Sequence, residues 1–127
     1  MYKLSKRSMS KLDGVHPDLI RVVRRAIQLT EIDFTITEGR RTIERQKQLV
    51  AAGASRTMNS RHITGHAVDF AALVGGKVRW DWPLYAKIAA VFKRAAKELG
   101  VFIVWGGDWK SFKDGPHVEL DRKKYPA

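Results

Sequence analysis

The longest periodic run of apolar residues constrains the fold more than any other feature of the sequence. Apolar side chains recur at helical spacing over Leu84–Leu99, after the helix-start signal Trp82-Pro83 and before the stop signal Gly100. A second helical stripe follows His16-Pro17-Asp18, in which Pro occupies the first helical position and Asp complements the helix dipole. We therefore predict two amphipathic helices, over residues 17–27 and 82–99.

Short segments between these helices alternate apolar and polar side chains, as half-buried strands do. Strands are predicted over residues 34–37, 66–71, 101–105 and 117–120. A third helix is predicted over residues 42–52, closed by Gly53, and residues 54–64 and 108–116 are predicted loops. With 44% apolar residues in 127, the chain has material for one compact core. The expected fold is a small single α+β domain, residues 1–127, with helices packed on a mainly antiparallel sheet.

Composition limits the available chemistry. The chain has no cysteine, so disulfides, thiolate catalysis and cysteine-ligated zinc are excluded, and a metal site would need His and carboxylate ligands. The formal net charge of +11 favours encounter with polyanions such as nucleic acid, teichoic acid or a lipid surface, without choosing among them. The basic N-terminus is not followed by an apolar run of signal-peptide length, and we expect no membrane-spanning segment.

Histidines and carboxylates concentrate in two polar segments on either side of the predicted helix 82–99. They are His62, His66, Asp69, Asp114, His117 and Glu119. A catalytic zinc ion typically takes three protein ligands, so that water keeps a fourth position and becomes acidic enough to act as a nucleophile. A lone histidine is more often an ordinary surface or capped residue. Spacing alone therefore leaves both interpretations open.

Three family motifs favour the metal site, and their order along residues 34–120 is the order expected in the family. The motif that contains most of the candidate ligands is described first. Ser60-Arg61-His62-Ile63-Thr64-Gly65-His66-Ala67-Val68-Asp69 resembles the Ser-x-His-x-x-Gly-x-Ala-x-Asp signature of the zinc enzyme family that contains D-Ala-D-Ala carboxypeptidases and L-alanyl-D-glutamate peptidases. Asp114-Gly115-Pro116-His117 resembles the second family element, and Trp105-Gly106-Gly107-Asp108-Trp109 is similar to the phage endolysin branch. Glu38-Gly39-Arg40-Arg41-Thr42 with Gln46 resembles the stretch Gly-x-Arg-Ser-x-x-x-Gln, with Thr42 in place of the usual Ser.

The resemblance implies a Hedgehog/DD-peptidase-like fold and a Zn²⁺ ion held by His62, Asp69 and His117. It also implies that Asp114 is the general base that takes a proton from the metal-bound water. Asp114 has a structural interpretation as well, because Asp-Gly and Gly-Pro both favour turns. Many relatives carry Glu at this position, and the shorter Asp fits the endolysin-like branch.

Further roles are predicted for residues that flank the ligands. Arg41 corresponds to the family arginine that faces the substrate carbonyl, where a fixed cation stabilises developing negative charge; the alternative is a solvated basic residue. Ser60 resembles a substrate-contacting hydroxyl, or else caps its own backbone. Trp109 and Trp105 would line the cleft for the peptide, although tryptophan in so small a domain is more often in the core.

Two neighbours of the motifs have smaller predicted roles. Glu119 should share a strand face with His117, where its carboxylate would accept a hydrogen bond from the imidazole. His66 occupies a variable family position and is expected to line the pocket or lie on the surface, outside the ligand set.

The leading hypothesis is a phage-type endolysin that hydrolyses the bond between L-Ala and D-Glu in the stem peptides of peptidoglycan and so lyses the host. A D-Ala-D-Ala carboxypeptidase would use the same metal set. A metal-dependent nuclease or nucleic-acid-binding protein would also suit the charge, but basic residues are spread along the chain and no nucleic-acid motif is present. A catalytically silent wall-binding relative is a third possibility, against which an intact Asp114 argues.

The same reasoning sets expectations about partners and location. We expect a monomer that binds peptidoglycan, is held against anionic envelope polymers by its charge, and does not bind nucleic acid. Because the sequence shows no signal-peptide pattern and similar phage lysins stay in the cytoplasm until the membrane is opened, we expect the protein to stay in the host cytoplasm until it is released to the cell wall.

Overall fold

The computed structural model describes residues 1–55 and 57–126, which form helices and one antiparallel sheet. The helices are α1 (Lys6–Lys11), α2 (Pro17–Leu29), α3 (Ile43–Ala51), α4 (Trp82–Leu99) and the short 3₁₀ helix η1 (Gly106–Asp108). The strands are β1 (Asp33–Glu38), β2 (Ala67–Val74), β3 (Lys77–Arg79), β4 (Ile103–Trp105) and β5 (His117–Leu120). Their order is β1-β2-β5-β4, and β3 pairs with β2. Within the described residues, no helix combines the length and apolar character needed to cross a bilayer.

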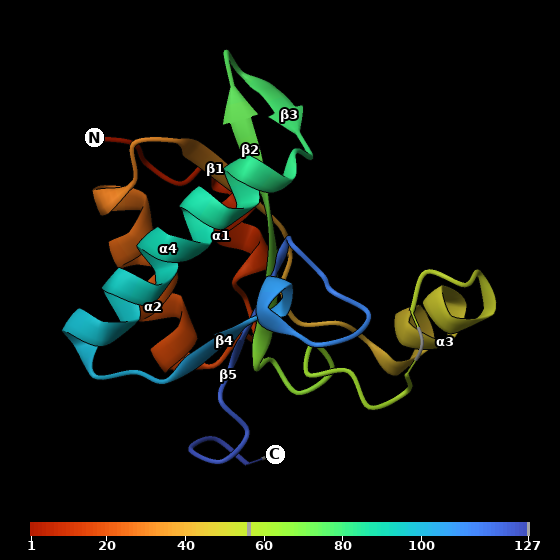
Figure 1. Cartoon of the computed structure of the whole chain (residues 1–127). Coiled ribbons are helices and arrows are strands. Elements are labelled where there is room, and N and C mark those ends of the chain that lie inside the picture. Colours follow the sequence, from red (N-terminus) through yellow and green to blue (C-terminus); the bar gives the residue numbers. More distant parts are fainter. Residues whose placement is uncertain (56, 127) are drawn as a thin grey trace.

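Helices α2 and α4 cover one face of the sheet, and the core lies between them and the strands (Figure 1). In β2, Val68 and Phe70 point to this face because side chains alternate along a strand. The Phe70 ring stacks on Phe92 of α4 with centroids 5.4 Å apart, and Phe34 of β1 lies 5.2 Å from the same Phe92 ring. Burial of each such side chain contributes roughly 1.5–3 kcal/mol, so this aromatic group ties β1, β2 and α4 together.

The predicted helices and strands are confirmed, with differences at their ends. Helix α2 begins at Pro17 with His16 as its N-cap, and α4 ends at Gly100, which adopts the left-handed conformation. Strand β2 continues three residues past the predicted end, into a hairpin with β3. Strand β4 is shorter and only half-buried, because it forms an edge of the sheet.

Helix α1 was not predicted, because its sequence is polar and carries no apolar stripe. Ser5 caps its N-terminus, and the buried Ser8 hydroxyl accepts a hydrogen bond from the Ile36 backbone N–H at 3.0 Å. The same hydroxyl hydrogen-bonds Thr35 Oγ1 at 2.7 Å. Strand β1 lies at the edge of the sheet, so α1 satisfies backbone groups that would otherwise be unpaired.

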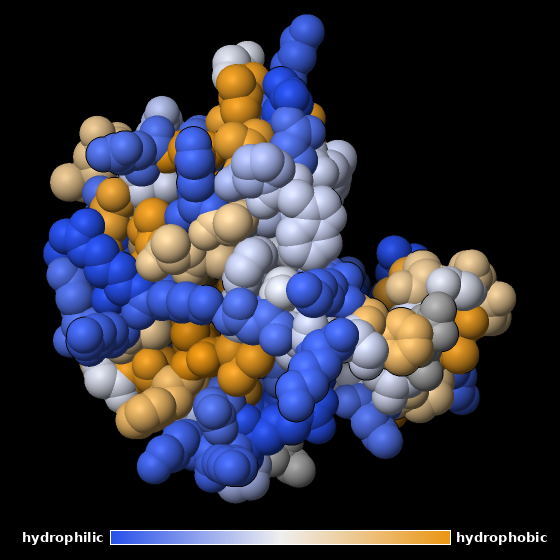
Figure 2. Space-filling model, viewed as in Figure 1, coloured by the Kyte–Doolittle hydropathy of each residue, from blue (hydrophilic) through white to orange (hydrophobic). Residues whose placement is uncertain are grey.

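Helix α3 and the loop after it stand off from the rest of the molecule (Figures 1 and 2). The helix was predicted correctly, but its apolar stripe does not join the core: Ile43 and Val50 are 57% and 36% exposed. Its buried residue is the polar Gln46. This segment therefore contributes little to the core and is available to form one wall of a groove.

Candidate metal centre

Two carboxylate side chains and one imidazole lie in a row across the middle of the sheet. Asp69 of β2 pairs with Glu38 of β1 on one side and with His117 of β5 on the other. Residues directly opposite in antiparallel strands bring their side chains together on one face. Because Phe70 and Val118, the next residues along their strands, point into the core, this row lies on the opposite face of the sheet. Strand pairing thus joins residues that are far apart in the sequence.

His62 reaches this row from the turn that precedes β2. The turn depends on Gly65, which has a φ of +77°, and a Cβ at that position would lie 2.3 Å from the Gly14 carbonyl oxygen. The His16 backbone N–H donates to the Gly65 carbonyl at 2.8 Å, and that of Arg41 donates to the His62 carbonyl at 2.8 Å. The backbone of the turn is therefore held on two sides, which explains the glycine in the motif.

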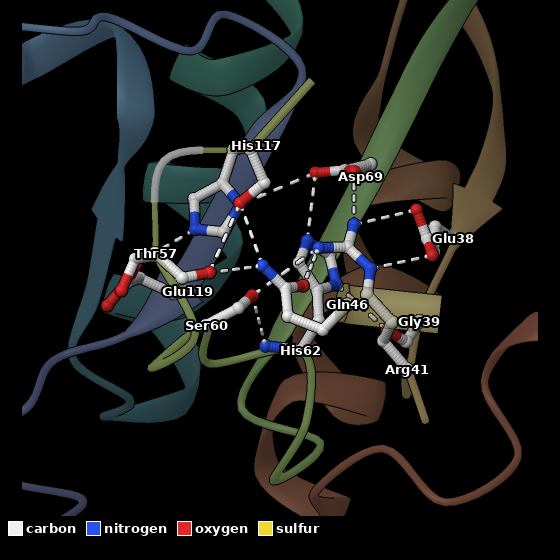
Figure 3. A network of polar contacts seen from close by, with 11 residues as sticks. Glu38, Gly39, Arg41, Gln46, Thr57, Ser60, His62, Asp69, His117 and Glu119 are labelled. Atoms are coloured by element: carbon white, nitrogen blue, oxygen red, sulfur yellow. Dashed lines mark hydrogen bonds and ion pairs between the residues drawn. The ribbon is translucent and has the colours of Figure 1, made fainter. Parts of the chain in front are cut away.

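The three predicted ligands converge as expected (Figure 3). His62 Nε2 lies 3.2 Å and His117 Nδ1 3.4 Å from the same oxygen, Asp69 Oδ1, and ligand atoms of the three residues lie within 4.8 Å of one another. Both imidazoles are buried, whereas the Asp69 side chain is 20% exposed. The trio could hold a metal ion.

Both imidazoles are oriented by acceptors on their far sides. The Gly39 carbonyl lies 2.8 Å from His62 Nδ1, and because a carbonyl only accepts, Nδ1 donates to it and Nε2 is the nitrogen that faces Asp69 and the centre. His117 Nε2 lies 2.8 Å from Glu119 Oε1 (Figure 3), which leaves Nδ1 facing Asp69. These are the outer hydrogen bonds that orient and strengthen metal-binding imidazoles. The predicted contact between Glu119 and His117 is confirmed.

The electrostatics of the site keep Asp69 and its neighbour Glu119 ionised. Burial favours neutral Asp69, but hydrogen bonds from His117 and His62 outweigh burial and hold the pKa of Asp69 well below its ordinary value. Burial likewise opposes a charge on His117, yet its hydrogen bonds to Asp69 and Glu119 prevail and raise the pKa of His117 to about 9. Glu119 has a lowered pKa because the contact with His117 overcomes its burial. Without a metal, the protonated His117 imidazole thus bridges two carboxylates, with Nδ1–H facing Asp69 and Nε2–H facing Glu119.

Asp114 lies in a tight turn just before β5. Its backbone N–H donates to the Gly106 carbonyl at 3.1 Å, and its own carbonyl accepts from the His117 backbone N–H at 3.2 Å. Burial, followed by the negative charge of Asp69, raises the pKa of the Asp114 carboxyl. A partly buried carboxylate with a raised pKa beside the trio is well suited to accept a proton.

This turn is braced from behind by two aromatic residues. A Cβ on Gly115 would lie 2.5 Å from Tyr85 Cδ2, so the turn rests directly on the Tyr85 ring. The Trp105 indole N–H donates to the Gly115 carbonyl at 2.7 Å. The position of Asp114 relative to the trio is therefore set by α4 and β4 as well as by β5.

Arg41 lies buried beside the trio and is held by several acceptors (Figure 3). Its Nε and Nη2 donate to the two carboxylate oxygens of Glu38 at 2.8 and 2.7 Å, and Nη1 donates to Gln46 Oε1 at 2.7 Å. Nη2 also lies 3.7 Å from Asp69 Oδ2. Burial raises the pKa of Glu38, but the hydrogen bond and charge of Arg41 outweigh it and lower that pKa. The guanidinium is therefore a fixed cation next to the candidate metal site.

A groove of about 820 Å³ opens over these residues. Leu49 and the loop after α3 form one wall, and Trp109 and the loop before β5 form another. The Trp109 ring lies 5.0 Å from that of His117. Ser60 also lines the groove, and its hydroxyl accepts from the His62 backbone N–H at 3.2 Å and from Arg41 Nη1 at 3.5 Å. His66 instead hydrogen-bonds Thr64 at 2.8 Å, outside the trio.

Comparison with known proteins identifies the family. Residues 1–126 match the family model described as phage L-alanyl-D-glutamate peptidase.

The chain belongs to this family.

It is 39% identical over 128 residues to the L-alanyl-D-glutamate peptidase of Escherichia phage T5, covering 98% of this chain and 93% of that protein. The L-alanyl-D-glutamate peptidase of Listeria phage A118 is 36% identical over 123 residues, which are 94% of this chain and 42% of that longer protein.

A solved structure of a family relative confirms the fold. The crystal structure of the Serratia marcescens L-Ala D-Glu endopeptidase ChiX superposes with a TM-score of 0.93 at 48% sequence identity, covering 98% of this chain and 95% of that one. The predicted α+β class and the family resemblance are both confirmed.

Some residues that shape this family member's site were not assigned roles from the sequence. Glu38 and Gln46 lie in the quoted family stretch, only three and five residues from Arg41, but their hold on its guanidinium was not predicted. Arg61 lies inside the metal motif at a variable position; it is 5% exposed, with Nε 3.7 Å from Glu119 Oε2. Tyr85 was not singled out in the sequence, and nothing in its spacing signals contact with the Asp114 turn.

Proposed function

We propose that this chain is a zinc-dependent endopeptidase that hydrolyses the bond between L-Ala and D-Glu in peptidoglycan stem peptides. The observation that carries the proposal is the convergence of His62, Asp69 and His117, whose imidazoles are each oriented by an outer acceptor, at the floor of a groove. Membership of the phage L-alanyl-D-glutamate peptidase family and the activities for which its relatives are named support the choice of bond.

The donor set fits zinc. Two imidazole nitrogens and one carboxylate oxygen match a catalytic zinc site with three protein ligands, and cysteine thiolates are absent from the sequence. Tying the outer nitrogens of His62 and His117 to acceptors presents the inner nitrogens as ligands. Zinc held there would supply a Lewis acid that polarises a carbonyl and makes bound water acidic near neutral pH.

Two further residues would then act on the peptide. Asp114 would accept a proton from the attacking water and return it to the leaving amine; its raised pKa suits this exchange. Arg41 would place its positive charge against the negative charge that develops on the scissile carbonyl oxygen, and because Glu38 and Gln46 already fix the guanidinium, little reorganisation is needed.

The groove walls would position the substrate on either side of the bond. Ser60 lies beside Arg41 and His62, where its hydroxyl can also donate to a peptide carbonyl. Trp109 presents a partly exposed ring next to His117 and would pack against the stem peptide.

The family and the net charge support proposals about the partners and the location of the enzyme. We propose that residues 1–127 act as one catalytic domain and as a monomer, with peptidoglycan as substrate and no nucleic-acid partner. The net charge of +11 would hold the protein against anionic envelope polymers. As in similar phage lysins, it would remain in the host cytoplasm until released to the wall.

Digestion of purified peptidoglycan tests the scissile bond. Mass spectrometry should find new D-Glu amino termini, and a chelator should abolish them. Release of free D-Ala without such termini would instead indicate the D-Ala-D-Ala carboxypeptidase, and salt-sensitive DNA binding or cleavage without wall lysis would indicate the nuclease.

Two variants separate metal binding from proton transfer. Asp114→Ala should retain zinc but lose lytic activity, and His117→Ala should lose both. Glu98→Ala, which removes an exposed carboxylate that pairs with Arg25 outside the groove, is the matched control and should keep both properties. Unchanged lysis in either site variant would contradict the assigned roles.

A further inference from the structure

The β2–β3 hairpin leads directly into the start of α4 (Figure 1), and Trp80 and Trp82 lie at this junction. Trp80 and Trp82 are 55% and 48% exposed, although tryptophan is usually mostly buried. Both pack edge-on against Tyr85, with ring centroids 6.3 and 5.8 Å away, and Trp82 also lies 6.4 Å from Trp105. We call Trp80, Trp82 and Trp105 with Tyr85 the aromatic platform.

The aromatic platform adjoins the catalytic groove through shared structure. Tyr85 supports the Gly115 turn, and the Trp105 indole bonds the Gly115 carbonyl at 2.7 Å. On the other side of η1 from Trp105, Trp109 lines the groove and contacts His117. The platform and the groove thus lie on two sides of the same turn, and a ligand long enough to span that turn would contact both.

The rim of the platform carries charges of both signs. Lys93 Nζ lies 2.7 Å from Asp108 Oδ2 and 5.4 Å from the centroid of the Trp105 ring. Arg79 forms an ion pair with Asp81, between Trp80 and Trp82 in the sequence. Aromatic faces bordered by paired donors and acceptors suit a neutral, hydroxyl-rich ligand. An anionic lipid surface would meet the acidic partners of both pairs, so it fits less well.

We propose that the aromatic platform is a subsite for the glycan strand of peptidoglycan. Pyranose rings present apolar C–H faces that stack on the electron-rich face of an indole, while Lys93 and Asp108 can hydrogen-bond hydroxyl and N-acetyl groups. The inference rests on the proposed function. The L-Ala of the stem is joined to the sugar chain itself. When peptidoglycan is cleaved after L-Ala, a sugar therefore lies within about one residue length of the groove.

Kinetics on two substrates test the subsite. One substrate is a stem peptide still attached to its glycan, and the other is the same peptide without sugar. Trp82→Ala and Trp80→Ala should each lower kcat/KM on the glycan-attached substrate by roughly 2- to 12-fold, the range of one aromatic contact. Activity on the free peptide should stay within about twofold of the native enzyme. Phe102→Ala, which removes a 54% exposed ring outside the platform, is the control and should change neither.

Other outcomes would overturn the subsite. Equal losses on both substrates would show a structural effect on the turn, and no loss on either would show that the platform contacts no sugar. Loss of binding to phosphatidylglycerol vesicles in Trp82→Ala, with native cleavage of the glycan-attached substrate, would assign the platform to a membrane surface.

A binding measurement keeps this inference separate from the proposed function. If the native protein cleaves neither substrate, the proposed function fails, but the subsite can still be tested with chito-oligosaccharides by tryptophan fluorescence. Saturable binding that Trp82→Ala weakens and Phe102→Ala retains would support the subsite. Absence of binding by the native protein would overturn it.

Discussion

Glu119→Gln should weaken zinc binding although Glu119 is not a predicted ligand. Its Oε1 lies 2.8 Å from His117 Nε2, and both residues are 5% exposed, so water cannot replace the contact easily. Glutamine keeps the volume and can still offer an oxygen, but it removes the negative charge that makes the imidazole more basic. Loss of such an outer partner typically costs 10- to 100-fold in metal affinity, or roughly 1.4 to 2.7 kcal/mol.

Competition with a chromophoric chelator at fixed pH measures this change. Glu98→Gln is the matched control, because it removes an exposed carboxylate that pairs with Arg25 at 2.8 Å between α2 and α4. We expect the control to retain native zinc affinity within about twofold, consistent with an exposed ion pair that contributes little. Arg61, 3.7 Å from Glu119, would also lose its anionic neighbour, so folding of each variant is checked by circular dichroism. A folded Glu119→Gln variant with native zinc affinity would refute the reasoning.

Three further predictions concern pH, the turn and the arginine. In the metal-free protein, the raised pKa of His117 stabilises the fold. This stabilisation is complete below the ordinary histidine pKa of 6.5 and is lost as the pH rises through about 9, a change in the free energy of unfolding of at most about 3 kcal/mol. The lowered pKa values of Asp69 and Glu119 act in the opposite sense, because the stability that they contribute is lost as the pH falls below the ordinary carboxyl range. The denaturant concentration at the unfolding midpoint should therefore decline on both sides of roughly pH 5 to 6.5. A midpoint that rises from pH 6.5 to 9 would contradict this. Gly115→Ala places a Cβ 2.5 Å from Tyr85 Cδ2 and must displace the turn, so kcat should fall about tenfold or more while zinc is retained. A native kcat would show that Asp114 needs no such bracing. Arg41→Lys loses the paired hydrogen bonds to Glu38, and kcat/KM should fall by about 10² or more, whereas a native value would remove Arg41 from the proposed mechanism.

Much of the fold could be predicted because its longer elements have strong local patterns. Helices α2 and α4 carry continuous apolar stripes, and His16-Pro17 and Gly100 mark their ends. Helix α1 could not be predicted in this way, since its buried residue is Ser8 and its position depends on the edge of β1. Helix α3 was predicted, but its apolar residues Ile43 and Val50 remain exposed instead of joining the core.

The convergence of His62, Asp69 and His117 could be predicted from motif spelling but not from spacing. Nothing local to Asp69 or His117 shows that they stand opposite each other; that pairing is a property of the sheet. The period of a strand did predict that Glu119 shares a face with His117. The bracing of Gly115 by Tyr85 and Trp105 involves contacts between distant elements, which no short sequence window contains.

The central claim is that His62, Asp69 and His117 hold a zinc ion that the enzyme needs. Anomalous diffraction at the zinc absorption edge, from crystals of zinc-loaded and lytically active protein, tests it most directly. The account predicts a single strong peak in contact with the two imidazoles and the Asp69 carboxylate. Active protein with no peak there, or with a peak held by other residues, would contradict it.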